Sequence, residues 1–330
     1  MNKKYMTGEW IAILAVLSFL VSNVLFRRTE KEASPIFINF IRTAIGTITF
    51  FILSFFYNVF FSIFLLPVEL WLLLCISFLF GQVIGDTSYF QAQKILGTTI
   101  ALAISMTFPF FTLIFSLIFL KRPFEIKLIL SLILISIGII IISKTKMSTE
   151  ENELSRKQSE NVFDKAKIKS LFSKESFKAI IYGLIAALAW ATGLVMIDFA
   201  TNEINQILNL EGLSSVIGNV IRFPFALLIL SSMVFSETIY NKKRKIKRQQ
   251  KKDLISWLIL IIASLIGTSL GAYLYTEAAR TAGATVMSLI ASASPLFSLP
   301  LTYWVNKERI TKIGFLGVIL TVIGVIIVII

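Results

Sequence analysis

Apolar residues occur along this chain in runs of about 20, separated by polar segments. A helix that rises 1.5 Å per residue needs roughly 20 apolar residues to cross about 30 Å of hydrocarbon. Helices are required because lipid offers no partner for free backbone N–H and C=O groups. We therefore predict an all-α integral membrane protein with ten transmembrane helices. The expected spans are 9–26, 36–57, 66–85, 98–120, 124–143, 178–199, 212–236, 254–275, 284–305 and 313–330.

The pattern of residues is also repeated within the chain. Residues 81–142 match residues 267–328 at a constant offset of 186, without a gap. Matched pairs include Gly81 and Gly267, Gly85 and Gly271, Tyr89 and Tyr275, and Pro109 and Pro295; upstream, with small shifts, Asn39 and Arg42 match Asn219 and Arg222, and Phe19 matches Trp190. Such duplication is typical of secondary transporters.

The repeat divides the chain into two five-helix halves, residues 1–143 and 178–330, joined by a charged linker over 144–177. Because five is odd, the second half must enter the membrane from the side opposite to the first. The sequence thus predicts two inverted repeats related by an axis in the membrane plane.

Composition narrows the chemistry that the chain can perform. Of its residues, 56% are AVILMFWYC, there is no histidine, and Cys75 is the single cysteine. Disulfides within the chain, metal sites built on cysteine or histidine, and Ser-His-Asp catalysis are excluded. We expect no cofactor, no metal and no enzymatic activity. The apolar run after Lys4 lacks a small-residue cleavage pattern, so we interpret it as the first span.

Charge predicts an orientation. Alternating spans place 24 of the 32 Lys and Arg residues on one side and six on the other, while Arg42 and Arg222 lie within spans. By the positive-inside rule the richer side is cytoplasmic, so both termini would lie outside a plasma membrane.

The most basic segment is KKRKIKRQQKK, residues 242–252. We favour a topology anchor, and binding of anionic lipid head groups is the alternative. Nucleic acid is not an expected partner, because no aromatic side chains are interleaved with the charges. The expected partners are the bilayer and a small-molecule solute, with the chain a monomer or weak dimer.

The matched G-x-x-x-G, Tyr, Ala, Gly-x-Thr and Pro positions, in two five-helix halves, resemble the drug/metabolite transporter superfamily, EamA type. The resemblance implies a carrier that moves small metabolites, often amino acids or related solutes, by alternating access. It also implies cytoplasmic termini, against the charge count.

Several positions are candidates for a substrate cavity. Pro109 and Pro295 sit mid-span, where each would free a carbonyl near the bilayer centre, as binding sites of transporters often require. A kink satisfied by neighbouring hydroxyl groups is the structural alternative. Hydroxyl groups near them belong to Ser105 and Thr107 in one copy, and to Ser288, Ser292 and Ser294 in the other.

A second group surrounds matched aromatic residues of the first span in each half. Phe19, with Ser22 and Asn23, corresponds to Trp190, with Thr192. An aromatic ring beside small polar groups could form an apolar cavity wall. Ordinary core packing is the equal alternative.

The eighth span carries a polar stripe, Ser269, Tyr273 and Glu277, spaced to share one helical face. We assign Ser269 and Tyr273 to the cavity. Candidates for a gate or rim are Asp86, Tyr89, Tyr275 and Glu277, with a plain interfacial role for the two carboxylates equally open.

Arg42 and Arg222, beside Asn39 and Asn219, lie six or more residues inside their spans. Charge there is costly unless it faces the protein interior. Attraction of an anionic solute is one interpretation, and hydrogen bonding to neighbouring helices is the one we favour.

Together these features predict a secondary transporter of a small organic metabolite, an exporter or an importer, with one central cavity between the two repeats. A channel-like facilitator and a membrane-embedded enzyme are the alternatives.

Overall fold

The computed structural model describes residues 7–29, 34–96, 101, 104–122, 125–157, 174–243, 254–294, 297 and 312–330. Within these ranges the ordered elements are helices. They are α1 (Gly8–Thr29), α2 (Pro35–Phe56), η1 (Phe60–Leu65), α3 (Val68–Phe78), η2 (Leu79–Asp86), α4 (Thr87–Leu96), α6 (Phe108–Phe119), α7 (Ile126–Lys157), α9 (Lys174–Leu208), α10 (Leu213–Lys243), α11 (Leu254–Ser264), η3 (Leu265–Gly271), α12 (Ala272–Ala282), α13 (Ala284–Ser292) and α15 (Lys312–Ile329). The prediction of an all-α chain is confirmed.

Five of these helical runs are long and apolar enough to cross a membrane, and four shorter ones are also apolar. The long runs are Ile36–Phe56, Val68–Gln93, Phe177–Leu208, Leu213–Tyr240 and Leu254–Ala282; the shorter are Gly8–Asn23, Phe108–Phe119, Ile126–Ile141 and Ile313–Ile329. Of the expected span 284–305, α13 covers the first part and most of the rest lies outside the described residues. Ten spans therefore stay a prediction.

Many large apolar side chains on these helices face outward. Ile52 is 62% exposed, Leu228 71% and Leu254 75%. Water would penalise such surfaces, whereas hydrocarbon does not. The exposed apolar faces therefore support a chain surrounded by lipid.

The helices extend into the segment expected as a linker. α7 continues past residue 143 to Lys157, and α9 begins at Lys174. The sequence predicted a loop from its polar composition, but the stretch 144–157 contains no Pro or Gly and several good helix formers, so the helix need not end with the apolar run. Residues 158–173 lie outside the described ranges.

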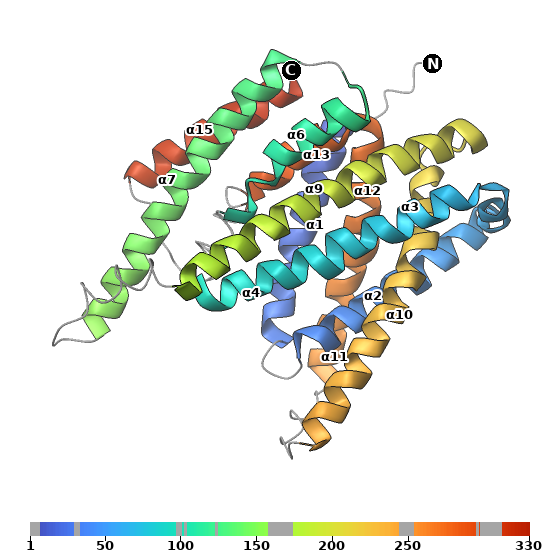
Figure 1. Cartoon of the computed structure of the whole chain (residues 1–330), viewed down its shortest axis with the longest axis horizontal. Coiled ribbons are helices and arrows are strands. Elements are labelled where there is room, and N and C mark those ends of the chain that lie inside the picture. The colour runs from blue at the N-terminus through green and yellow to red at the C-terminus, as the bar shows by residue number, and fades with distance from the viewer. Residues whose placement is uncertain are drawn as a thin grey trace. The chain divides into compact units, whose positions relative to one another are not determined.

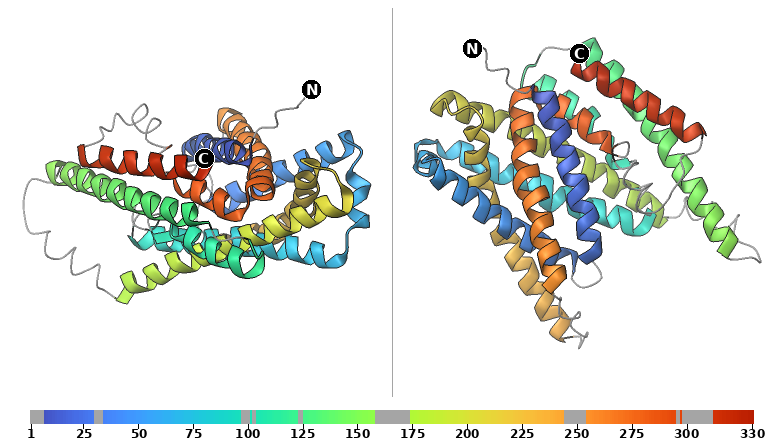
Figure 2. Two further views of the ribbon diagram at one scale, coloured as in Figure 1. Left: turned by 90° about the horizontal axis from the view of Figure 1, so that it is seen from above. Right: turned by 180° about the vertical axis from the view of Figure 1, so that it is seen from behind.

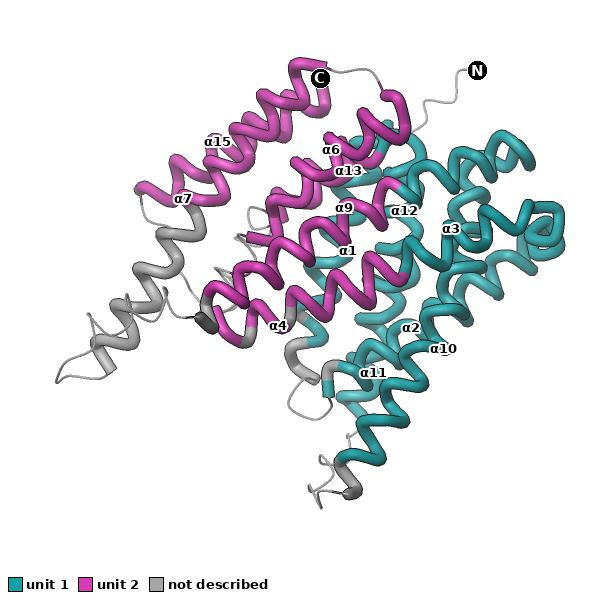
Figure 3. The backbone as a smooth tube through the Cα atoms, in the orientation of Figure 1, with its two compact units in different colours: residues 1–78, 196–283 teal, residues 79–195, 284–330 magenta. Residues whose placement is uncertain are grey.

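The chain divides into two compact units, coloured separately in Figure 3. Unit 1 comprises Met1–Phe78 and Met196–Gly283, and unit 2 comprises Leu79–Val195 and Ala284–Ile330. Each unit therefore takes helices from both sequence halves. The repeat boundaries themselves stay a prediction.

In unit 1, α1 packs along α11, η3 and α12, and α2 packs along α10. Figure 2 shows α1 beside the helix formed by residues 254–282. The buried hydroxyl of Ser22 donates to the Ala263 carbonyl at 2.8 Å, tying α1 to α11. A buried apolar cluster around Phe50, Leu74 and Ile217 fills the space between α2, α3 and α10.

In unit 2, α7 and α15 run side by side, as Figure 1 shows. Their closest approach is made possible by glycine. A Cβ on Gly138 would lie 2.6 Å from the Gly317 carbonyl, and one on Gly324 would lie 2.7 Å from Ile135. α6 packs against α13 in the same unit.

Two π-helical segments occupy equivalent places in the sequence repeat. η2 covers Leu79–Asp86 and η3 covers Leu265–Gly271. Each contains one G-x-x-x-G pair. The sequence did not predict them, because apolar periodicity does not distinguish a π-bulge within an α-helix from regular helix. Such bulges are frequent at functional sites.

Candidate functional site

The polar stripe predicted on the eighth span is buried among helices of unit 1. Ser269 donates to the Thr49 hydroxyl of α2 at 2.9 Å. One residue earlier, Thr268 accepts a 3.2 Å hydrogen bond from Nε of Arg42, also on α2. Further along, Thr276 and Glu277 contact α10. The stripe thus joins helices from both halves of the sequence.

Glu277 forms the strongest polar contact in this stripe. Its Oε2 accepts from Nε of Arg280 at 2.9 Å and from the Ser215 hydroxyl at 2.8 Å, and Nη2 of Arg280 lies 2.5 Å from its Oε1. Ser215 lies in the first turn of α10, where the helix dipole favours a nearby anion. Glu277 is 7% exposed, so the carboxylate of the ion pair is buried among the helices of unit 1.

Tyr273 lies beside this ion pair. Its hydroxyl would be 3.0 Å from a Cβ on Gly212, the residue before α10, and Glu277 is the next neighbour of that position. Tyr273 is half-buried and also packs on the apolar cluster of unit 1. Tyr273 therefore contacts the apolar cluster, while its hydroxyl lies near Gly212 at the start of α10.

Arg222 and Asn219 form a second buried group one turn further along α10. Nη1 of Arg222 lies 3.3 Å from Oδ1 of Asn219 and 3.5 Å from the Thr276 hydroxyl. The guanidinium carbon lies 5.3 Å from the centre of the Phe78 ring, within range of a cation–π contact. Arg222 is 8% exposed and Asn219 is fully buried.

The repeat counterpart of Arg222 has different surroundings. Arg42 is half-buried, lies 5.5 Å from the Phe26 ring and donates its Nε to Thr268. Asn39 is also half-buried. The two arginines are therefore equivalent in sequence but not in environment.

Phe19 contributes to an aromatic contact in unit 1. Its ring meets Tyr275 edge-on with centroids 5.9 Å apart, and its edge would lie 3.1 Å from a Cβ on Gly271. Ser22 of the same helix faces Gly267 at very close range. Asn23 is exposed, so the described structure does not bring it to this group.

Trp190 makes the equivalent contact in unit 2. Its ring lies 5.5 Å from that of Tyr89, and its Cδ1 would be 2.5 Å from a Cβ on Gly85. Its Nε1 also donates to Asp86 at 2.9 Å, and Phe108 meets it edge-on. Gly81, the other glycine of this G-x-x-x-G pair, has open space around its Cβ position.

Pro109 does not interrupt a continuous helix. It lies in the first turn of α6, which begins at Phe108 after a turn at residues 106–107. No intrahelical hydrogen bond is lost at such a position, because the first N–H groups of a helix have no intrahelical partner. The interruption is therefore real, but it precedes the proline.

The hydroxyl groups expected near the prolines turn inward to backbone carbonyls. Ser105 is buried and lies 3.4 Å from the Gly183 carbonyl of α9. The others donate to nearby carbonyls of their own segment: Thr107 to Ile104, Ser288 to Thr285, Ser292 to Leu289 and Ser294 to Ala291. Thr192, predicted beside Trp190, likewise donates to Leu188. Pro295 lies outside the described residues.

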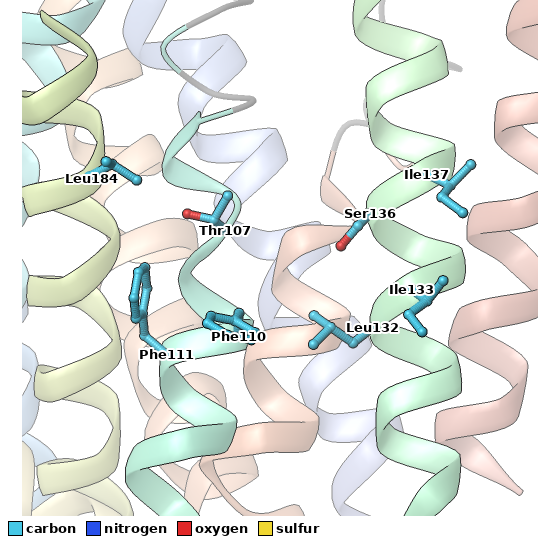
Figure 4. Close-up of a pocket in the computed structure, with 8 residues that line it drawn as sticks. All are labelled: Thr107, Phe110, Phe111, Leu132, Ile133, Ser136, Ile137 and Leu184. Atoms are coloured by element: carbon cyan, nitrogen blue, oxygen red, sulfur yellow. The ribbon is translucent and has the colours of Figure 1, made fainter.

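Unit 2 also contains an apolar pocket of about 470 Å³ between α6, α7 and α9, drawn in Figure 4. Its walls are Thr107, Phe110, Phe111, Leu132, Ile133, Ser136, Ile137 and Leu184. Of the hydroxyl groups named for the cavity, Thr107 is the one that lines it. The predicted aromatic and polar candidates are elsewhere.

The described side chains of this site offer groups that can bind and orient a solute. Within the described ranges, no three His, Cys, Asp or Glu side chains gather where they could hold a metal ion. The polar groups are hydrogen-bond donors and one ion pair, set between helices with lipid-facing outer surfaces.

These features define a class: a multi-pass, all-helical membrane protein with polar contacts buried inside a repeated set of spans. The chain belongs to the EamA-like transporter family, whose model matches residues 6–144 and 177–330. As a member of that family it is a membrane transporter of small solutes. The resemblance inferred from the matched glycine, tyrosine and proline positions is confirmed.

Two comparisons extend over nearly the whole chain. An uncharacterized transporter of Archaeoglobus fulgidus (strain ATCC 49558 / DSM 4304 / JCM 9628 / NBRC 100126 / VC-16) is 23% identical over 305 residues, which cover 91% of this chain and 90% of the relative. A solved structure, titled as the crystal structure of a protein, matches with a TM-score of 0.68 at 13% identity. It covers 97% of this chain and 95% of the other, and it supports the fold alone.

Proposed function

We propose that this transporter carries a small organic metabolite, an amino acid or a related solute, by alternating access at a central cavity between the two repeats. The observation that carries the proposal is a pair of equivalent contacts. Phe19, Gly271 and Tyr275 in unit 1 match Trp190, Gly85 and Tyr89 in unit 2.

Each of these contacts joins a first span of one half to a third span of the other. The two halves therefore exchange equivalent helices, as inverted repeats of a transporter do when each rigid body is assembled from both. A duplicated scaffold that forms the same contact twice gives two similar bodies. Two such bodies are the mechanical requirement for opening a binding site first to one side and then to the other.

The chain connections between the units support movement. The chain passes between them at Phe78–Leu79, Val195–Met196 and Gly283–Ala284. At the first, regular helix gives way to the π-helical η2. At the last, Gly283 has φ of 92°, a conformation that L side chains rarely adopt. Positions that absorb backbone change are where hinges form.

The test is counterflow in proteoliposomes that contain the purified full chain. Vesicles are loaded with an unlabelled mixture of the twenty amino acids, or with nucleosides, or with short organic acids, and uptake of a trace labelled member is followed. A carrier takes up label transiently against its gradient and saturates. Conductive flux without acceleration would indicate a channel, and the absence of flux with every mixture would contradict the proposal.

A further inference from the structure

Arg222 and Asn219 each have a buried hydrogen-bond donor that no described residue uses. These donors are Nε of Arg222 and Nδ2 of Asn219. The bonds that Nη1 of Arg222 does make, at 3.3 and 3.5 Å, are long for a charged donor. Inside a membrane span, unsatisfied donors carry a large free-energy cost. Such a cost indicates a partner other than the described residues.

The missing partner should be an anion. Glu277 is the nearest carboxylate of the stripe, but both of its oxygens are occupied by Arg280, and one also by Ser215. No described carboxylate pairs with Arg222, so the buried group retains one positive charge. A charge that is buried without its counter-ion is among the least favourable states in a protein.

The unused donors suit a carboxylate better than a spherical ion. One N–H belongs to a guanidinium and the other to an amide on the preceding turn, at i and i−3, on one face of α10. Two oxygens joined in a plane can accept from both donors at once. The guanidinium carbon lies 5.3 Å from the centre of the Phe78 ring, so an aromatic ring contacts the guanidinium while its Nε–H stays unused.

Polar side chains connect this group to the exposed end of α10. Glu211 is exposed, Arg280 is half-buried, and Glu277 and Ser215 follow in the direction of Asn219. The Glu277–Arg280 ion pair therefore lies between the exposed end and the unused donors.

Arg42 occupies the equivalent place in the repeat, and its Nε does have a hydrogen-bond partner. Its Nε donates to Thr268, and it is half-buried rather than buried. The interpretation favoured from sequence, that both arginines act structurally through neighbouring helices, fits Arg42. Arg222 also contacts a neighbouring helix, through Thr276 of α12, but its Nε has no partner among the described residues.

We propose that Nε of Arg222 and Nδ2 of Asn219 bind the carboxylate group of the transported solute. This inference rests on the proposed function and adds the substrate class: solutes that bear a carboxylate. Thr276 is a positioning residue, because it contacts Arg222 and Asn219 from α12 and holds their unused donors on the same side.

The test uses formate, the smallest carboxylate, as the probe on purified full-length protein. Thermal unfolding is measured in sodium formate, in sodium chloride of equal ionic strength, and in formamide, which has the shape of formate without its charge. We expect formate to raise the midpoint above both controls, since a ligand stabilises the state that binds it. In Arg222→Gln the apparent affinity should fall roughly tenfold to a hundredfold.

Matched variants separate binding from folding. Arg42→Gln removes the same charge from the repeat-equivalent place and should retain the formate response. Should Arg222→Gln not fold, Asn219→Leu and Thr276→Val test the same site with the arginine in place. An equal response to formate and chloride in the wild type, or a full formate response in Arg222→Gln or in both milder variants, overturns the proposal.

The two proposals fail in different ways. If counterflow occurs with neutral solutes alone and is unchanged in Arg222→Gln, the transport function stands and the carboxylate site is wrong. If the formate response depends on Arg222 but no mixture gives counterflow, the site stands and the transport mechanism is wrong.

Discussion

The indole Nε1–H of Trp190 donates a 2.9 Å hydrogen bond to the Asp86 carboxylate within unit 2. The repeat counterparts are Phe19, which has no such donor, and Ala272, which has no acceptor side chain. Both units have an aromatic ring packed against a glycine and a tyrosine. The hydrogen bond from Trp190 to Asp86 is an additional contact in unit 2.

We predict that Trp190→Phe destabilises the protein by about 1–3 kcal/mol, because a charged acceptor loses its donor in a partly buried place. Asp86→Asn should cost less, since Oδ1 can still accept. Thermal unfolding of the purified protein in detergent measures both. Phe19→Leu, which changes the equivalent ring without any hydrogen bond, is the control. A loss for Trp190→Phe no larger than for Asp86→Asn would show that the bond contributes little.

Alanine at the glycines of the two G-x-x-x-G pairs should have unequal effects. A Cβ on Gly85 would lie 2.5 Å from the rigid indole of Trp190, whereas Gly81 has nothing within 4 Å. We expect Gly85→Ala to cost about 1–3 kcal/mol, as overpacking does, and Gly81→Ala to be neutral or mildly stabilising. Unfolding midpoints check both. Equal losses would mean that the π-helical backbone, rather than ring packing, requires glycine.

Apolar periodicity predicts where helices lie, but it does not predict irregularities within them. Apolar runs predicted an all-helical membrane chain because lipid imposes the length of each apolar helix, and the same constraint applies wherever the chain crosses. The π-helical segments η2 and η3 were missed, because a bulge leaves the composition unchanged. The turn at residues 106–107 was also missed, since Pro109 was interpreted as an interior kink rather than as a residue of the first turn of α6.

The candidate site shows the same division. The repeat identified Arg42 and Arg222 as a pair and therefore suggested equal roles. Their difference depends on which helix each side chain meets, and that follows from the packing of α2 and α10 in one unit. The ion pair of Glu277 with Arg280 could be found from their i, i+3 spacing. The added contact with Ser215, 62 residues away, could not.

Breaking the ion pair should be costly. Glu277→Gln removes the carboxylate from Arg280 and Ser215, and we expect a loss of about 3–5 kcal/mol, as for other buried pairs that lose one partner. Arg280→Met alone should be similar. The double variant should lose less than the sum, because neither charge is then left without its partner. Unfolding of the four proteins gives the coupling free energy. A coupling near zero would show that the two side chains act independently.

Hydroxyl groups of the predicted cavity are tested by ligand-induced stabilisation. A thermal-shift screen against amino acids, nucleosides and organic acids should find a stabilising solute, worth about 2.7 kcal/mol at a concentration one hundred times its Kd. Tyr273→Phe should weaken that shift, because its hydroxyl lies beside Gly212 and is not needed to satisfy its own helix. Ser292→Ala should weaken it if the hydroxyl turns from the Leu289 carbonyl to the solute. If both variants retain the full shift, the cavity assignment is wrong.

Orientation can be decided with the single cysteine as a starting point. Cys75 is replaced by alanine, and one new cysteine is placed either at Gln249, within the basic segment 242–252, or at the exposed Glu69, in the first turn of α3. The charge asymmetry predicts that a membrane-impermeant maleimide added to whole cells labels Glu69→Cys and spares Gln249→Cys. Both should react after the membrane is opened, which controls for buried thiols. The reverse pattern would place both termini in the cytoplasm. In that case the chain would have the orientation that the family resemblance implies, with the side that carries 24 Lys and Arg residues outside the cytoplasm.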